Sequence, residues 1–164
     1  LMLVQQSAEN NVDLVTAVLQ VALSVHNDLT KPLQMSSGRR YLATRCLVLS
    51  LSLTRRLLGL MRAMVYGPHS ANQHRLLTPA LAELFNGLFR TCREEPEEER
   101  ENAEKGWPSL SGPKWLVKQQ MLRLTHALLE GDGDNSLALR LAEGLEMVPI
   151  FTLLRDIEQS SALT

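Results

Sequence analysis

The sequence predicts an all-α fold, either a helical bundle or a short α-solenoid, with five to seven helices and one long acidic loop. Aromatic residues make up only 4% of the chain, so leucine and valine must build the core, and leucine loses little rotamer freedom in a helix. Apolar residues also recur at steps of three and four, the period of an amphipathic helix. Proline and glycine separate these segments.

A single domain over residues 1–164 is expected, because a chain of this length buries about two-thirds of its unfolded surface. The chain begins at Leu1 without an initiator methionine, and we treat it as a fragment of a longer chain. Its two cysteines, Cys46 and Cys92, lie within apolar helical patterns. Buried free thiols in a reducing compartment are the simplest explanation, which predicts an intracellular protein of the cytoplasm or nucleus.

The segment "RRYLATRCLVLSLSLTRRLLGLMRAM" (Arg39–Met64) fits a helix better than a membrane span or a strand. Its uncharged run from Cys46 to Thr54 is far shorter than the roughly 20 apolar residues that a span needs. Gly67-Pro68 marks its end, since proline cannot continue a helix. The predicted buried stripe follows steps of three and four through Leu42, Cys46, Leu49, Leu53, Leu57, Leu60 and Met64.

This helix phase places five arginines on the arc opposite the predicted stripe, and they are the predicted partner-binding residues: Arg40, Arg45, Arg55, Arg56 and Arg62. No acidic residue occurs between Leu29 and Ala82. Arginine on a rigid helix suits bidentate contacts with carboxylate or phosphate. Four interpretations of these arginines are compatible with the sequence: a solvated helix face, pairing with the chain's own acidic segment, contact with an acidic protein partner, and contact with nucleic acid.

Four further segments have a helical apolar stripe, and a short helix is expected to start at Ser136 and pause near Gly144. The first helix is expected to be capped by Asn10 or Asn11, and the next three to start at Thr78, Gly112-Pro113 and Pro149. Their predicted inward residues are, in chain order, Leu14, Val18, Val21 and Val25; Leu81, Leu84, Phe85, Leu88, Phe89 and Cys92; Val117, Met121, Leu124 and Leu128; and Ile150, Leu153, Leu154 and Ile157.

Residues 93–112 differ from the rest of the chain. Seven glutamates lie between Glu94 and Glu104, and the segment has no apolar stripe. Such a segment buries too little to offset its ordering entropy. It is predicted to be a flexible acidic loop inserted between helices.

The stretch "LAEGLEMVPIFTLLRDI" (Leu141–Ile157) resembles an armadillo repeat, in which a short helix ends at a glycine and a new helix has a leucine-rich inner face. The likeness covers residues 141–157 only. It implies an armadillo- or HEAT-like architecture, and such families are mostly protein-binding scaffolds.

No motif for catalysis, metal binding or a cofactor is found. "DGDNSLALRLAE" (132–143) is similar to a calcium loop, but Leu137 stands where that loop needs glycine. The four histidines are scattered, and no glycine-rich phosphate loop is present. The sequence therefore predicts a non-catalytic scaffold without cofactor, which binds another protein, one with an acidic segment among the possibilities, through a helical groove or a basic helix face. The alternative is a nucleic-acid-binding helical domain that uses the arginine-rich helix 39–64.

Overall fold

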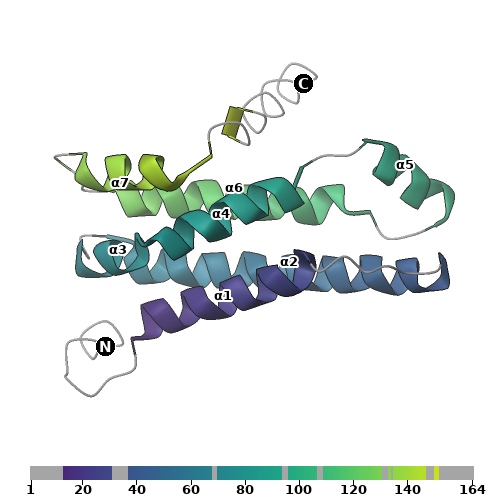
Figure 1. Ribbon diagram of the computed structural model, residues 1–164, viewed down its shortest axis with the longest axis horizontal. Helices are drawn as coiled ribbons and strands as arrows, with labels where there is room; N and C mark the ends of the chain where they lie inside the picture. Colours follow the sequence, from purple (N-terminus) through teal and green to yellow (C-terminus); the bar gives the residue numbers. More distant parts are fainter. Residues whose placement is uncertain are drawn as a thin grey trace.

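In the computed structural model of the chain, the described part comprises residues 13–30, 37–67, 70–93, 96–106, 109–130, 133, 135–146 and 150–151. Within these ranges the backbone is helical apart from short connections, and no strand is present, which confirms the all-α prediction (Figure 1). The seven helices in these ranges are α1 (Leu14–Thr30), α2 (Ser37–Val65), α3 (Ser70–Leu76), α4 (Pro79–Thr91), α5 (Pro96–Glu104), α6 (Ser111–Leu129) and α7 (Ser136–Gly144).

The four longest helices pack as two stacked pairs. α1 packs against α2, and α4 packs against α6. The second pair lies on the first, with α4 on α1 and α6 on α2. In Figure 1, α1 and α4 lie nearer to the viewer than α2 and α6, and α7 lies beyond α4 at the top of the stack. α7 contacts both α4 and α6. The α1–α2 pair therefore forms one end of the described stack.

The predicted core faces of α4 and α6 are confirmed. Five of the six predicted positions of α4 and all four of α6 are buried, and Phe89 is partly buried beside Phe85 in an edge-to-face contact. α1 is only partly as predicted, because Val18 is buried but Val21 is 51% exposed. Among residues 14–27 of α1, whose side chains the structure describes, the buried ones are Val15, Val18, Leu19, Ala22, Leu23 and His26. The last predicted helix, with Ile150, Leu153, Leu154 and Ile157, lies mostly outside the described residues.

α1 begins at Leu14, later than the predicted cap at Asn10 or Asn11 implies, and those two asparagines lie outside the described residues. Asp13 takes the capping position instead. The backbone N–H of Thr16 donates to Oδ1 of Asp13 at 3.2 Å, and the Thr16 hydroxyl donates to Oδ2 at 2.8 Å. A carboxylate here satisfies one of the backbone donors left free at the start of a helix.

The predicted phase of α2 is wrong, although the helix itself is confirmed. Five of the seven predicted inward residues are exposed, namely Leu42, Cys46, Leu49, Leu53 and Leu60, whereas Leu57 is partly buried against the core and Met64 is buried. A second stripe with equally good spacing is buried instead, and it consists of Leu51, Thr54, Leu58, Met61 and Val65, with Leu47 partly buried at its start. The two stripes lie roughly 120° apart at 3.6 residues per turn. Thr54, a polar residue in the middle of the true core stripe, made that stripe look less apolar.

The short helix α3 satisfies the carbonyl groups that α2 and α6 leave free at their C-terminal ends. The amide of Asn72 donates to the backbone oxygen of Met64 at 2.9 Å. The amide of Gln73 donates to the backbone oxygens of Ala127 and Glu130 at 3.2 and 3.0 Å. Both side chains are buried, so these bonds remove a desolvation cost at two helix ends. α3 thereby ties α2 to α6.

The acidic segment 93–112 is not a continuous loop as predicted, because residues 96–104 form α5. Glutamate has a good helix propensity, and proline at the first position of α5 suits a helix start. Two local ion pairs, Arg100 with Glu104 and Lys105 with Glu101, join residues one turn apart. Helix formation here thus needs no apolar face. The flexibility of the segment stays a prediction.

Candidate interaction surface

The face of α2 that turns away from the core presents a continuous row of exposed side chains. Its members follow steps of three, four, four, three and four, so they lie in line along the helix over roughly 27 Å. We call this row the outer stripe of α2, and it consists of Leu42, Arg45, Leu49, Leu53, Arg56 and Leu60. The four leucines are 60%, 69%, 44% and 44% exposed in chain order.

No described helix covers the outer stripe. α2 uses its opposite flank, which includes Leu51, Leu58 and Met61, to pack in the core with α1 and α6. Single exposed leucines are common on protein surfaces, but a linear set of four on one helix is the kind of apolar patch that marks an interaction site. Cys46 lies on the same side of α2 and is exposed, which corrects its predicted burial.

The five predicted partner-binding arginines do not form one face. Arg45 and Arg56 are exposed within the outer stripe, whereas Arg55 and Arg62 are half-buried and lie roughly 130° around the helix from it. The side chain of Arg40 lies outside the described residues. Of the four arginines whose side chains the structure describes, it therefore brings Arg45 and Arg56 together, and it places them among leucines rather than opposite them.

Arg45 and Arg56 are free of ion pairs with the described residues. The guanidinium of Arg45 lies 5.8 Å from the centre of the Tyr41 ring, one turn earlier on α2. This cation–π contact orients the charged group without neutralising it. α2 contains no acidic residue over its whole length, so no carboxylate of the same helix compensates the charges of Arg45 and Arg56.

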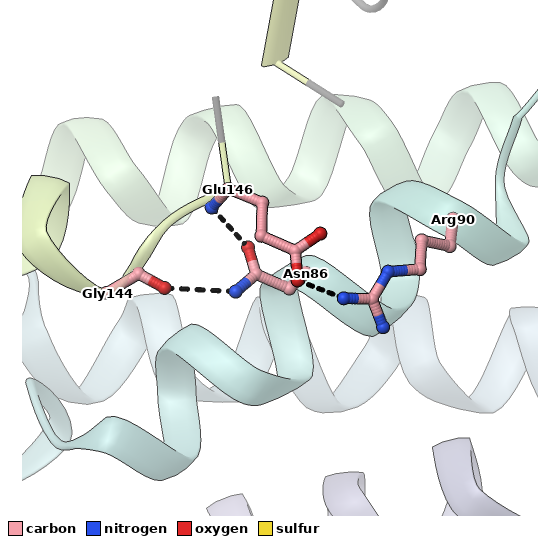
Figure 2. A network of polar contacts seen from close by, with 4 residues as sticks. All are labelled: Asn86, Arg90, Gly144 and Glu146. Atoms are coloured by element: carbon pink, nitrogen blue, oxygen red, sulfur yellow. Dashed lines mark hydrogen bonds and ion pairs between the residues drawn. The ribbon is translucent and has the colours of Figure 1, made fainter. Parts of the chain in front are cut away.

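A second feature is a hollow of about 320 Å³ between α4 and the end of α7, lined by Pro79, Ala82, Glu83, Asn86, Arg90, Gly144 and Glu146. The amide of Asn86 donates to the backbone oxygen of Gly144 at 2.9 Å and accepts from the backbone N–H of Glu146 at 2.9 Å (Figure 2). Arg90 forms an ion pair with Glu146. These polar groups hold the end of α7 on α4, which is a structural role.

His26 is the one buried histidine among the described residues. It is 6% exposed on α1, and its Nδ1 has no hydrogen-bond partner in the described part of the chain. Burial lowers its pKa below 6.5, while Glu83 raises it and Arg90 lowers it. The ring packs against Gly87 of α4, so His26 is part of the α1–α4 contact.

Among the described residues, no three His, Cys, Asp or Glu side chains are placed to hold a metal ion together. No helix in the described ranges is both long enough and apolar enough to cross a membrane.

Sequence reasoning found the residues of the outer stripe but assigned its leucines to the core. The spacing of two arginines in the sequence indicated instead that these leucines are exposed. Arg45 and Arg56 lie three residues after Leu42 and Leu53 and four before Leu49 and Leu60, so they belong to the same row as these leucines. A row that contains two arginines is a poor candidate for a core stripe, because a buried unpaired charge is costly.

Comparison of the chain with protein-family models, with curated proteins and with solved structures finds no match.

Proposed function

We propose that this chain is a non-catalytic interaction scaffold that binds another protein through the outer stripe of α2. The observation that carries the proposal is the exposure of Leu42, Leu49, Leu53 and Leu60 in one row. Covering an apolar side chain contributes roughly 25 cal/mol for each Å² of apolar surface removed from water. A linear apolar row on a rigid helix suits another helix, which places its own apolar residues at the same period.

We also propose an armadillo- or HEAT-like stacking of helical units. The pair α1–α2 is followed in the chain by the pair α4–α6, and α4 packs on α1 while α6 packs on α2. This is the order expected of successive two-helix repeats. α7 packs on α4 as the first helix of a third unit would, and it ends at Gly144. Residues 150–151 again have helical backbone, which supports the resemblance of residues 141–157 to a repeat. In such a stack, an end layer has one face free for a further helix.

The nucleic-acid alternative receives less support from this geometry. A phosphate-binding surface gathers cations, whereas the arginines of α2 are spread around the helix and the two exposed ones alternate with leucines. The placement of Arg45, Arg55, Arg56 and Arg62 therefore gives less support to contacts along a phosphate backbone than to a protein partner. Binding of an RNA or DNA oligonucleotide that falls steeply with salt would favour the alternative over the protein partner.

Site-specific photo-crosslinking tests the proposal. A benzophenone amino acid replaces Leu49 in the outer stripe or, as a control, Leu139, which is 63% exposed on α7. We expect the probe at position 49 to crosslink a defined protein that the probe at position 139 does not. That protein, once identified and purified, should bind the unmodified chain, and the double substitution Leu49→Ser/Leu53→Ser should weaken the binding while Leu139→Ser leaves it unchanged. Equal crosslinking at both positions, or binding that is insensitive to the stripe variant, contradicts the proposal.

A further inference from the structure

The geometry of the outer stripe points to a more specific partner: we infer that it binds an acidic amphipathic helix of another protein. In this arrangement the apolar face of the partner helix covers Leu42, Leu49, Leu53 and Leu60, and its carboxylates pair with Arg45 and Arg56. This inference rests on the proposed function and adds the chemical class of the partner.

The spacing of the two arginines defines where the acidic residues of the partner lie. Arg45 and Arg56 are eleven residues apart, which is close to three full turns, so their side chains leave the same side of α2 roughly 16 Å apart. A partner helix that runs along the stripe meets this spacing with two carboxylates that are also three turns apart. Its apolar residues then lie between and beyond the carboxylates, opposite the leucines.

The electrostatics of α2 favour an acidic partner. Neither Arg45 nor Arg56 forms an ion pair with any described residue, and α2 has no acidic residue to compensate them. Covering the leucines with a neutral or basic helix would remove the two guanidinium groups from water without a counter-charge, which is unfavourable. Arginine pairs with carboxylate through two parallel hydrogen bonds, and Tyr41 already orients one of the two side chains.

A second copy of α2 is a poor occupant because of the same charges. An antiparallel pair centred between Ser50 and Leu51 would place each Arg45 opposite the Arg56 of the other copy. A parallel pair in register would place each arginine opposite its own equivalent. Both arrangements bring like charges together at the centre of an apolar contact.

The acidic helix of this chain is also a poor occupant. α5 has the sequence PEEERENAE, in which Ala103 is the only helix-forming apolar residue. It therefore has no apolar face that could cover the four leucines of the outer stripe. Its described ion pairs are internal to the segment, between Arg100 and Glu104 and between Lys105 and Glu101. An acidic partner needs an apolar face as well as carboxylates.

Fluorescence anisotropy with two synthetic helical peptides tests the inference. The first peptide, about six turns long, carries leucines at the spacing of the outer stripe and two glutamates three turns apart. The second is identical except that lysines replace both glutamates. The chain is used unchanged, as the charge reversal Arg45→Glu/Arg56→Glu, and as the control reversal Arg123→Glu/Arg140→Glu, which changes two exposed arginines of α6 and α7. Circular dichroism establishes that each variant is folded.

We expect the unchanged chain to bind the glutamate peptide at least about tenfold more tightly than the lysine peptide. The charge reversal at Arg45 and Arg56 should invert this preference, so that the lysine peptide becomes the better ligand. The control reversal should keep the original preference. Such an exchange of specificity requires direct pairing between the peptide and residues 45 and 56, because a general loss of folding would weaken the binding of both peptides alike.

Other outcomes overturn the inference, and they separate it from the proposed function. If the chain binds both peptides with equal affinity and loses both with Leu49→Ser/Leu53→Ser, the result supports the outer stripe as a binding site but contradicts the inference that its partner is acidic. If neither peptide binds, the inference of an acidic partner helix is wrong. The crosslinking experiment alone then tests the proposed function. Binding to phosphatidylserine vesicles but to neither peptide would assign the stripe to a lipid surface. A dimer that forms on concentration and dissociates with the leucine variant would assign it to a second copy.

Discussion

His26 of α1 occupies the space that a side chain at Gly87 of α4 would need. A Cβ atom built on Gly87 would overlap Nε2, Cδ2 and Cε1 of the imidazole ring. His26 is 6% exposed, so the ring has little room to move aside. Glycine at position 87 thus lets α1 and α4 approach closely, and the α1–α4 contact depends on this pair of residues.

Gly87→Ala should lower the free energy of unfolding by about 1–2 kcal/mol, because overpacking in a well-filled contact outweighs the gain in helix propensity. Gly59 of α2 is the matched control, since nothing lies within 4 Å of a Cβ built there. Gly59→Ala should raise the free energy of unfolding by up to about 1 kcal/mol. Urea denaturation of the two variants measures both values. Stabilisation by Gly87→Ala would show that the ring is not held against α4.

Stability should fall as the pH is lowered through the range in which His26 titrates. Burial lowers the pKa of His26 in the folded chain, so the unfolded chain binds the proton more readily. At a pH well above 6.5, the ordinary pKa of histidine, the residue is neutral in both states and contributes no pH dependence. As the pH falls below that value, the unfolded state is protonated first, and stability decreases until the folded pKa is reached.

Denaturation between about pH 7.5 and pH 5.5 measures this loss, which amounts to about 1.4 kcal/mol for each unit by which the two pKa values differ. His26→Gln removes the titrating group and should flatten the dependence, even if it lowers stability at every pH. His126, which is exposed on α6, provides the control substitution His126→Gln. An equally steep dependence in the His26 variant would assign the effect to other groups.

Leu58→Ala should cost about 2–5 kcal/mol of unfolding free energy, because Leu58 is completely buried in the core stripe of α2. Leu53→Ala should cost less than about 1 kcal/mol, because 44% of Leu53 is exposed in the outer stripe. The two substitutions remove the same atoms from the same helix, so chemical denaturation of the pair reports which side of α2 faces the core. A larger effect at Leu53 would restore the phase predicted from the sequence.

Asn86→Ala should release the end of α7 from α4. The substitution removes both hydrogen bonds to the backbone of Gly144 and Glu146, with an expected cost of about 1–2 kcal/mol. Amide hydrogen exchange at Glu146 should become faster. Arg90→Ala breaks only the exposed ion pair with Glu146, and its effect on stability should stay below about 0.5 kcal/mol. A larger effect from Arg90 than from Asn86 would contradict this ranking.

Much of the fold follows from local sequence. The helical stripes predicted for α4 and α6 are the ones that the structure buries, with Phe89 partly buried, so the helix and its core face were predicted correctly in both cases. The end of α2 before Gly67 was also predictable, since Gly67 has a φ of 87°, a conformation that glycine adopts without cost. These features depend on residues within a few turns of each other.

The acidic segment shows where composition alone was insufficient. The absence of an apolar stripe predicted a flexible loop, although Asn102 and Leu110 of the segment are buried. It did not exclude helix, because the helix propensity of glutamate and ion pairs one turn apart act without burial. The sequence contains both signals, the missing apolar stripe and the helix propensity of glutamate. The helix propensity, which is the weaker of the two, decided the local structure.

The sequence by itself determined that residues 37–65 form a helix, but only the tertiary structure decided which side of that helix is buried. α2 carries two mainly apolar stripes, one through Leu53 and one through Leu58, and both satisfy the helical period. The choice between them depends on which stripe fits the side chains that α1 and α6 present, and those contacts join residues far apart in the chain. That choice also left Arg45, Arg56 and four leucines together on the surface, because residues that share a row on one helix are buried or exposed together.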